Sequence, residues 1–400
     1  MKTSKYLLLG GGMVAGYAAK QLVESGLKAG ELTIVSADGA NPYERPPLSK
    51  GFLAGKDTEA SIFINTNDFY QSHEITILLS RVAEWVDPTR KRVQLRSGEE
   101  IGFEKLVVAT GARVRTLEVP GADLEGVCYL RTLEDSKRIR EQAGSAKRAV
   151  VIGGGFIAME VASVLARKGI ETTMVMPDDR IWKRFFTSAM SRFFEKYYTD
   201  RGVRFAKNTK VTKLKGVTGA KSVALETGAV LDCDMVVAGV GVSPVTEPLA
   251  NSGIELMNGV VVNEYLETNQ PDVYAAGDVA SYYDVLFDKH RRAEHWDNAV
   301  SQGQHCARII LGERKPFIHV PYFFSDVFDL SYEFWGDPSS AEEIIERGDL
   351  SSSSFSVWWL RQGRLVAAFT MNRPDEEREA APRLIQSKEP ASAATLPGTR

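Results

Sequence analysis

Short apolar runs that end in glycines occur twice in the chain, and apolar residues at helical spacing follow each of them. The first run covers residues 6–9, glycines occupy 10–12, and Ala18, Ala19 and Leu22 continue the apolar pattern. A short continuous apolar run is typical of a buried strand, and spacings of three and four residues are typical of an amphipathic helix. The pattern therefore predicts a strand, a tight turn and a helix near the start of the chain.

The second copy repeats this order, with an apolar run at 149–152, glycines at 153–155, and apolar residues at Val161, Val164 and Leu165. Both copies match G-x-G-x-x-G/A between a strand and a helix. The first two glycines of this pattern allow a tight turn and close approach to a pyrophosphate, and the third position must be small so that the helix packs on the strand. The residues at these positions are Gly10, Gly12 and Ala15 in the first copy, and Gly153, Gly155 and Ala158 in the second.

Each unit leads to a second predicted strand that ends near an acidic residue. Residues 32–35 lead to Asp38 and residues 172–175 lead to Asp178, which lie 23 and 20 residues beyond the third motif position. A carboxylate at this distance accepts hydrogen bonds from the ribose hydroxyls of a dinucleotide. One such unit alone also occurs as an ordinary glycine turn, but two complete units predict two dinucleotides. In one chain these indicate a flavin and a nicotinamide, whose redox chemistry needs no protein nucleophile.

Two further apolar strands end in sharp turns. Residues 106–109 precede Thr110 and Gly111, and residues 273–276 precede a glycine and Asp278. Asp278 has two interpretations, as a helix N-cap and as a residue that binds the polyol of a cofactor. The second glycine unit lies between these two strands, so the simplest topology has a first domain interrupted by a second.

We therefore predict an α/β fold with two Rossmann-like dinucleotide-binding domains, the second inserted in the first, plus a small α+β C-terminal domain. Strand-like runs at 355–360 and 365–370 support the third domain. The predicted boundaries are 1–113 with 245–317 for the first domain, 114–244 for the second, 318–387 for the third, and 388–400 for a disordered tail.

Composition and charge exclude several classes of protein. The 400 residues are 44% hydrophobic and 25% charged, which is the ordinary globular mix. The net charge of −3 gives no basis for a nucleic-acid or anionic membrane partner, and no apolar run of 18 residues could cross a bilayer. Cys128, Cys233 and Cys306 lie far apart in the sequence, and the histidines lack ligand spacing, so we expect no metal site. Unpaired cysteines and the absence of a visible targeting segment favour the cytoplasm.

The stretch at 41–50, Asn-Pro-Tyr-Glu-Arg-Pro-Pro-Leu-Ser-Lys, is long and specific. Together with both glycine units, Ala-Thr-Gly at 109–111, Ala-Gly-Asp at 276–278 and Glu-His-Trp at 294–296, it resembles the two-dinucleotide flavoprotein reductases. This family has a glutathione-reductase-like fold and includes the reductases of bacterial oxygenase ferredoxins, plant monodehydroascorbate reductase and apoptosis-inducing factor. The resemblance covers about residues 5–370.

The resemblance implies which residues contact each cofactor. The implied FAD contacts are Gly10, Gly12 and Ala15 at the pyrophosphate, Asp38 at the adenosine ribose, Arg45 and Lys50 at the flavin nucleotide, Ala83 at the adenine, Thr110, Gly111, Arg131 and Asp278 along the cofactor, and Trp296 at the pyrimidine end of the flavin. The implied NAD(P)H contacts are Gly153, Gly155, Ile157 and Ala158 at the phosphates, Asp178 and Arg184 at the adenosine ribose, Gly241 in the pocket wall, and Glu294 and His295 near the nicotinamide.

Several of these residues also have simpler interpretations. Arg45, Arg131 and Arg184 fit solvated surface positions. His295 and Trp296 fit a packed core.

Lys50 and Glu160 are the predicted catalytic residues. In the family, a lysine at the position of Lys50 lies beside the flavin N5 and pairs with the glutamate at the position of Glu160. A cation near N5 favours the electron-rich reduced ring. The alternative is a surface salt bridge, which contributes little.

The electron acceptor is suggested by where the sequence departs from its relatives. Residues 291–295 and 321–331 resemble monodehydroascorbate reductase most, yet the two arginines that this enzyme uses for the anionic ascorbyl radical align with Val300 and Asp326 here. A neutral residue and an acid disfavour an anionic substrate. Residues 296–299, Trp-Asp-Asn-Ala, are nearer to the ferredoxin-reductase pattern.

We therefore expect an FAD-dependent NAD(P)H oxidoreductase that passes single electrons to a small ferredoxin-type iron–sulfur protein. The alternatives are an NADH-sensing flavoprotein similar to apoptosis-inducing factor, with a long-lived charge-transfer complex, and a monodehydroascorbate or quinone reductase. Lys289, Arg291 and Arg292 are candidate cations for an acidic partner, or a solvated loop. The sequence does not distinguish a monomer from a homodimer.

The nicotinamide cofactor is expected to be NADH, with NADPH as the alternative. Asp178 repels a 2′-phosphate, whereas Arg180, Lys183 and Arg184 nearby could attract one.

Overall fold

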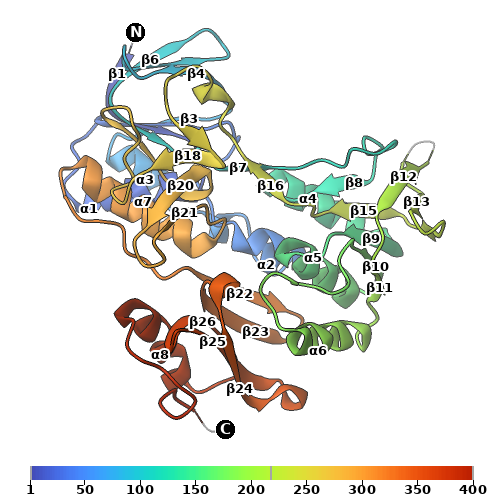
Figure 1. Ribbon diagram of the computed structural model, residues 1–400. Coiled ribbons are helices and arrows are strands. Elements are labelled where there is room, and N and C mark those ends of the chain that lie inside the picture. The colour runs from blue at the N-terminus through green and yellow to red at the C-terminus, as the bar shows by residue number, and fades with distance from the viewer. Residues whose placement is uncertain (1, 217–218, 399–400) are drawn as a thin grey trace. The chain divides into compact units, whose positions relative to one another are not determined.

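The computed structural model describes residues 2–216 and 219–398, which form two compact units (Figure 1). Unit 1 comprises Met1–Arg45, Glu59–Arg113 and Ser243–Pro321, and unit 2 comprises Pro46–Thr58, Val114–Val242 and Tyr322–Arg400. The chain crosses between the units five times, after Arg45, Thr58, Arg113, Val242 and Pro321. The crossings after Arg113 and Val242 lie within β7 (Ala112–Val114) and β16 (Val242–Pro244).

A seven-stranded sheet forms the centre of unit 1. Its strands are β1 (Lys2–Leu9), β2 (Leu32–Val35), β3 (Thr76–Leu78), β4 (Ala83–Asp87), β5 (Arg92–Leu95), β6 (Glu100–Val108) and β19 (Val273–Ala275). The order is β3-β2-β1-β6-β5-β4, and β19 pairs with β6. Strands β3, β2, β1, β6 and β19 pair in parallel, whereas β4 and β5 add an antiparallel edge. The apolar run of β1 is buried because a parallel sheet is covered on both faces.

Helices and a second sheet complete unit 1. Helix α1 (Met13–Glu24) packs against α7 (Trp296–Ile310). The smaller elements are α3 (Asn67–Ser72), η2 (Ala60–Ile62), η3 (Glu247–Leu249), η4 (Gly277–Val279), and the four-stranded sheet β17 (Leu256–Met257), β18 (Gly259–Val262), β20 (Ala280–Asp284) and β21 (Lys289–Arg291).

Unit 2 contains a parallel sheet of five strands in the order β11-β10-β9-β15-β8 (Figure 1). The strands are β8 (Val127–Tyr129), β9 (Arg148–Ile152), β10 (Glu171–Val175), β11 (Arg204–Ala206) and β15 (Met235–Ala238). The helices are α4 (Leu133–Ala143), α5 (Phe156–Arg167) and α6 (Ser188–Thr199), joined by η1 (Pro46–Ser49) and α2 (Gly51–Ala54) from the early segment. A small antiparallel sheet is formed by β12 (Val211–Lys215), β13 (Ser222–Leu225) and β14 (Val230–Asp232).

The last part of unit 2 is an antiparallel sheet in the order β22-β23-β26-β25-β24, with α8 (Asp375–Ser387) packed on β26 and β23. Its strands are β22 (Tyr322–Val327), β23 (Leu330–Gly336), β24 (Glu343–Asp349), β25 (Ser354–Arg361) and β26 (Arg364–Met371), with η5 (Pro338–Ser340) and η6 (Leu350–Ser352) between them. The predicted strand-like runs fall in β25 and β26. The predicted fold class, two Rossmann-like parts plus a small C-terminal α+β part, is confirmed.

Residues 388–398 differ from the disordered tail that composition predicts for 388–400, and the last two positions of that tail lie outside the described residues. Ala391 and Leu396 are buried. The guanidinium of Arg347 on β24 donates hydrogen bonds to the carbonyl oxygens of Ala393, at 2.5 Å, and Pro397, at 3.0 Å. Composition misses this contact because the partner lies about fifty residues earlier in the sequence. Within the described parts of the chain, no helix combines the length and apolar character needed to span a membrane.

Candidate functional site

The first glycine turn connects β1 to α1 in unit 1. Gly10 has a φ of +133°, and a Cβ there would lie 2.0 Å from the carbonyl oxygen of Ala109. Gly12 is the N-cap residue of α1, and in the described structure nothing lies within 4 Å of the place where its Cβ would be. Ala15 is fully buried in the first turn of the helix. Only a glycine therefore fits at the first position, and the second faces open space.

The second glycine turn, between β9 and α5 in unit 2, has the same geometry. Gly153 has a φ of +125°, and a Cβ there would lie 2.3 Å from the carbonyl oxygen of Gly239. Gly155 is the N-cap residue of α5 and, among the described atoms, has nothing within 4 Å of its Cβ position. Ala158 is buried where the helix passes the sheet.

Both helix starts meet the physical requirements of a pyrophosphate site. Among the residues that the structure describes, no side chain caps α1 or α5. The first N–H groups of a helix lack intrahelical partners and carry the positive end of the helix dipole. An anion in the open space before them satisfies these groups. The residues present therefore fit one dinucleotide in each unit.

Asp38 and Arg45, both predicted to contact FAD, lie together in unit 1. The hydroxyl of Tyr43 donates to the Asp38 carboxylate at 2.6 Å, and the Arg45 guanidinium lies 3.9 Å from the same carboxylate. Arg45 also lies over the Tyr43 ring, 4.7 Å from its centroid. Arg45 is thus partly buried in a polar cluster rather than fully solvated, and Tyr43 is a member that sequence reasoning missed.

Glu44 was also missed, although it lies inside the specific stretch at 41–50. Its carboxylate accepts hydrogen bonds from the hydroxyl of Tyr17 on α1 and from the indole Nε1 of Trp296 on α7, both at 2.5 Å. Burial and the neighbouring carboxylate raise the pKa of Tyr17, which keeps this hydroxyl a donor. Trp296 also packs against the core of unit 1, so it has the packing role that the alternative interpretation gave it. The indole orientation is set by a residue 252 positions away, for which the sequence carries no signal.

Thr110 and Gly111 follow β6 as predicted. The hydroxyl of Thr110 donates to the carbonyl oxygen of Val245 at 2.7 Å, and Gly111 adopts a φ of +68°. Ala83 begins β4 and is partly buried against the core of unit 1. These residues form a turn and a strand edge in the unit that holds the first glycine motif.

Arg292 connects two more predicted residues of unit 1. Its guanidinium donates to the carbonyl oxygen of Asp278, in η4, at 3.2 Å, and lies 2.5 Å from the Glu294 carboxylate. Arg292 is only 8% exposed in its side chain, so both contacts lie close to the protein interior.

The predicted nicotinamide-side residues of unit 2 lie around the second glycine turn and the end of β10. Ile157 is 44% exposed in the first turn of α5. Asp178 and Arg184 are exposed after β10. Gly241 has a φ of +97°, and its carbonyl oxygen accepts a hydrogen bond from the backbone N–H of Arg115 at 2.9 Å.

The cations near Asp178 are engaged by its neighbour. Asp179 lies 2.9 Å from the Lys183 ammonium and 3.6 Å from the Arg180 guanidinium. The hydrogen bond from Lys183 lowers the pKa of Asp179. These two cations are therefore less available to a 2′-phosphate than the sequence alone suggests.

The predicted site residues divide between the units. Unit 1 contains Gly10, Gly12, Ala15, Asp38, Arg45, Ala83, Thr110, Gly111, Asp278, Glu294, His295 and Trp296. Unit 2 contains Lys50, Arg131, Gly153, Gly155, Ile157, Ala158, Glu160, Asp178, Arg184 and Gly241. Arg131 precedes α4 and donates its backbone N–H to Asp135, which is part of the capping box of that helix.

Lys50 and Glu160 form a buried ion pair within unit 2. The Lys50 Nζ lies 2.7 Å from Glu160 Oε1, and the two side chains are 15% and 4% exposed. Glu160 also accepts hydrogen bonds from the hydroxyls of Ser49 and Ser325. The surface salt bridge considered as an alternative does not describe this pair. Sequence reasoning found both ions but missed both serines, of which only Ser49 lies in a recognisable motif.

His295 is the N-cap residue of α7 and is partly buried. Burial lowers the pKa of its imidazole to about 4, a lowering reinforced by Arg291 and opposed by the carboxylates of Asp278 and Asp297. The ring is therefore neutral near pH 7.

This shift predicts a pH dependence of stability. The pKa of the His295 imidazole is about 6.5 in the unfolded chain and about 4 in the folded protein. Between these values the unfolded chain binds the proton more strongly, so a lower pH favours unfolding. The contribution of His295 to the free energy of unfolding is therefore complete above pH 6.5. It decreases by about 3 kcal/mol as the pH falls towards 4. Urea unfolding of the wild type and of His295→Gln from pH 4 to 8 should show their stability difference shrinking below pH 6.5. Parallel stability curves over this range would contradict the assignment.

The fold and the two glycine turns define a class, α/β proteins that hold two dinucleotides in one chain. A family model described as pyridine nucleotide-disulphide oxidoreductase matches residues 4–303, and a second, described as reductase C-terminal, matches residues 322–399. The chain therefore belongs to the pyridine nucleotide-disulphide oxidoreductase family. It is an FAD-dependent NAD(P)H oxidoreductase, as the sequence predicts.

Individual relatives support the same assignment. The chain is 37% identical to peroxisomal monodehydroascorbate reductase 4 of Arabidopsis thaliana, over 96% of this chain and 82% of that protein. It is 33% identical to rubredoxin–NAD(+) reductase of Pseudomonas putida, over 93% and 96%. Among solved structures, putidaredoxin reductase in its covalent complex with putidaredoxin has a TM-score of 0.93 and 32% identity, over 98% of this chain and 94% of that one.

Proposed function

We propose that this oxidoreductase uses NADH and FAD to deliver single electrons to a small ferredoxin-type iron–sulfur protein. FAD, when bound, would supply the chemistry of accepting a hydride from NADH and passing on single electrons, and the protein would supply binding and orientation. The relatives include reductases named for rubredoxin and putidaredoxin, which supports a small electron-carrier protein as the acceptor.

One observation separates this acceptor from the ascorbyl radical. At the two positions where the ascorbate pattern has arginines, this chain has Val300, partly buried on α7, and Asp326, exposed on β22. Neither residue attracts an anion, and Asp326 repels one. Reduction of the ascorbyl radical is the second candidate, which the overall identity to monodehydroascorbate reductases favours.

Each part of the chain has a proposed task. The first glycine turn and the cluster of Asp38, Tyr43 and Arg45 hold FAD in a domain of residues 1–113 and 245–317. The second glycine turn and Asp178 hold NADH in residues 114–244, and the engagement of the nearby cations by Asp179 supports NADH over NADPH. Residues 318–387 form the C-terminal domain.

We assign Lys50 and Glu160 to the redox step. The family pattern puts Lys50 beside the reactive edge of the flavin, where a fixed cation favours the reduced ring. Glu160 holds the ammonium group at 2.7 Å in a buried setting, so the charge is oriented before the reaction begins.

The three cysteines of the chain have no proposed role in electron transfer. Cys128, Cys233 and Cys306 are each buried and unpaired. Burial raises the pKa of Cys233 to about 11 and that of Cys306 to about 12, so neither supplies a thiolate near pH 7. Unpaired cysteines fit a reducing compartment, and we propose the cytoplasm.

The candidate cations for an acidic partner are mostly engaged within the protein. Arg291 pairs with the buried Asp284 at 3.0 Å, and Arg292 pairs with Glu294 at 2.5 Å. Lys289 is exposed. The acceptor proposal therefore rests on the two substituted positions rather than on a basic patch.

A comparison of acceptors tests the proposal. With NADH as donor, we expect kcat/KM for a [2Fe–2S] ferredoxin to exceed that for the ascorbyl radical by at least about tenfold, since the like charge of Asp326 alone should weaken binding of the radical by roughly 1.4 kcal/mol or more. Val300→Arg with Asp326→Arg should raise activity with the radical and leave flavin reduction by NADH unchanged. Faster wild-type turnover with the radical would favour a monodehydroascorbate reductase, and turnover with quinones alone would favour a quinone reductase. A charge-transfer band that persists in air without turnover would favour an NADH-sensing flavoprotein.

A further inference from the structure

One face of α5 meets the first strand of the C-terminal sheet and the turn that follows it. Phe156, Glu160, Ser163 and Arg167 lie at spacings of four, three and four residues, which places them on one side of the helix. Each of these residues contacts β22 or its turn. Since α5 begins at the second glycine turn and carries Glu160, the C-terminal sheet packs directly on a helix of the proposed site.

The strand pattern of β22 directs a single polar side chain into this contact. Phe323, Ser325 and Val327 alternate as buried residues, whereas Asp326 is exposed. Phe323 packs edge-on against Phe156 with ring centroids 4.5 Å apart. The fully buried Ser325 donates its hydroxyl to Glu160 Oε1 at 2.6 Å. In a half-buried strand the buried positions are ordinarily apolar, so a hydroxyl here has a specific partner.

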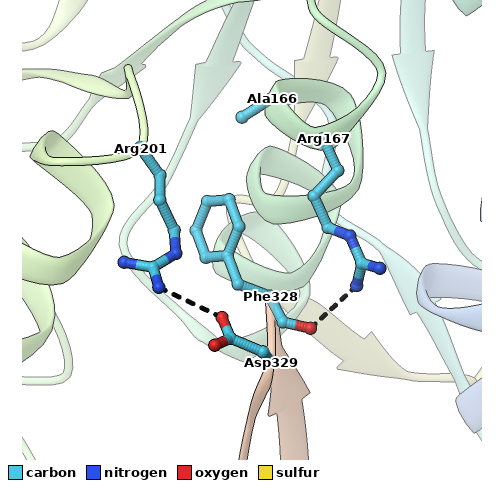
Figure 2. A pocket seen from close by; sticks show the side chains of 5 residues that line it. All are labelled: Ala166, Arg167, Arg201, Phe328 and Asp329. Atoms are coloured by element: carbon cyan, nitrogen blue, oxygen red, sulfur yellow. Dashed lines mark hydrogen bonds and ion pairs between the residues drawn. The ribbon is translucent and has the colours of Figure 1, made fainter.

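The turn after β22 fixes the register of this strand. The Phe328 backbone N–H donates to Ser163 at 2.9 Å, and Arg167 donates to the Phe328 carbonyl oxygen at 2.7 Å. Arg201 lies 3.2 Å from the Asp329 carboxylate. Figure 2 shows the two arginines reaching the turn from either side of Phe328. Because a one-residue slip would turn Ser325 away from α5, these contacts determine whether Ser325 reaches Glu160.

The hydrogen bonds to Glu160 come from three parts of unit 2. Oε1 accepts from Lys50 Nζ at 2.7 Å and from Ser325 at 2.6 Å, and Oε2 accepts from Ser49. The Lys50 ammonium also lies 5.5 Å from the ring centroid of Phe324 on β22. A buried carboxylate needs donors on both oxygens, and donors that come from different directions prevent it from rotating.

We propose that Ser325 is a positioning residue for the redox step, which orients the Glu160 carboxylate and through it the Lys50 ammonium. This inference rests on the proposed role of Lys50. It gives the C-terminal sheet a part in electron transfer, because the sheet supplies one of the donors that fix the charge.

The test compares Ser325→Ala, Ser325→Thr and Ser325→Val as FAD-loaded proteins. Loss of one hydrogen bond to a charged group should lower the rate constant of flavin reduction at saturating NADH about tenfold in Ser325→Ala. The dissociation constant for NADH should change less than about twofold, because Ser325 does not line the proposed NADH turn. The midpoint potential of bound FAD should become more negative, since a displaced cation stabilises the reduced ring less.

Threonine and valine form a matched pair, because they have nearly the same shape and only threonine keeps the hydroxyl. Ser325→Thr should restore both the rate and the potential, and Ser325→Val should not. The control is Ser356→Ala on β25 of the same sheet, a fully buried serine whose hydroxyl accepts from Trp358 at 2.9 Å. This control also loses a buried serine hydroxyl and its hydrogen bond, here to a neutral indole away from Glu160, so its rate and potential should match those of the wild type.

The outcomes distinguish the two proposals. Equal behaviour of the threonine and valine variants, or an equal loss in Ser356→Ala, would overturn the role of Ser325, because a structural effect would then suffice. An unaltered rate and potential in Lys50→Met would instead refute the assigned role of Lys50. A slow Lys50→Met protein beside a fully active Ser325→Ala protein would reject the positioning role alone.

Discussion

Lys50→Met should retain FAD and reduce it with NADH about 100-fold more slowly than the wild type, which is the usual effect of removing one oriented electrostatic group. The ion pair between Lys50 Nζ and Glu160 Oε1 is buried and 2.7 Å long, so solvent cannot replace the lost charge. Methionine keeps the length and apolar stem of lysine. Anaerobic stopped-flow measurement of the flavin absorbance at saturating NADH gives the rate constant.

The same substitution should also lower stability, because among the described residues it leaves the buried Glu160 with only the two serine hydroxyls as donors. Breaking a buried pair from one side costs about 3 kcal/mol, whereas replacing both partners costs less. Lys50→Met with Glu160→Gln should therefore recover most of the stability and none of the rate. Recovery of both would show that the slow reduction of the single variant was a folding effect.

The control for charge alone is Lys56→Met, which removes an exposed lysine from the same early segment of unit 2. The rate constant of flavin reduction and the free energy of unfolding of this variant should equal those of the wild type within experimental error. Reduction of Lys50→Met at the wild-type rate would exclude Lys50 from the redox step.

Gly155→Ala should raise the dissociation constant for NADH at least about 100-fold while the protein stays folded and yellow. The described structure leaves open space within 4 Å of the position of the added Cβ, so the substitution strains nothing in the protein itself. The new methyl group would instead occupy the place where the pyrophosphate approaches the start of α5. Loss of two or more phosphate hydrogen bonds corresponds to roughly 3 kcal/mol, or about 100-fold in affinity.

Gly12→Ala is the reciprocal variant, since the same open space lies before α1. It should yield a folded, colourless protein that fails to bind FAD. Titration with NADH and FAD, followed by fluorescence, measures both affinities in both variants. If Gly155→Ala lost FAD binding, or if Gly12→Ala lost only NADH binding, the assignment of FAD to the first turn and NADH to the second would be reversed.

The first glycine of each turn serves as a contrast. Alanine at Gly10 or Gly153 would place a Cβ 2.0 or 2.3 Å from a backbone carbonyl oxygen, and both positions have φ values in the left-handed region. We expect these variants to misfold rather than to lose one cofactor selectively. Thermal unfolding of all four glycine variants separates the two kinds of effect.

The parts of the fold that sequence predicts well depend on residues close together in the chain. Residues 6–9 and 149–152 are apolar runs followed by glycines, and these became β1 and β9 with their turns because strand, turn and helix are local patterns. The spacing of an acid after a strand, which occurs in both glycine units, likewise placed Asp38 and Asp178 beyond β2 and β10. Lys50 and Glu160 were found only through the family resemblance, since 110 residues separate them.

The parts that sequence could not predict depend on contacts between distant segments. The carboxylate of Glu44 joins Tyr17 to Trp296, and that of Glu160 joins Ser49 to Ser325. The residues next to a serine in a strand do not predict which distant group its hydroxyl will hydrogen-bond.

The sequence by itself determined that two dinucleotides bind, because each glycine motif is a continuous segment whose backbone supplies the phosphate site. Only the tertiary structure decided how the charges around them are held. A buried carboxylate takes its donors from whichever strands and helices pack beside it, and packing brings together residues that no spacing along the chain relates. The contacts of Ala393 and Pro397 have the same cause, since both carbonyl groups accept hydrogen bonds from one buried arginine of β24.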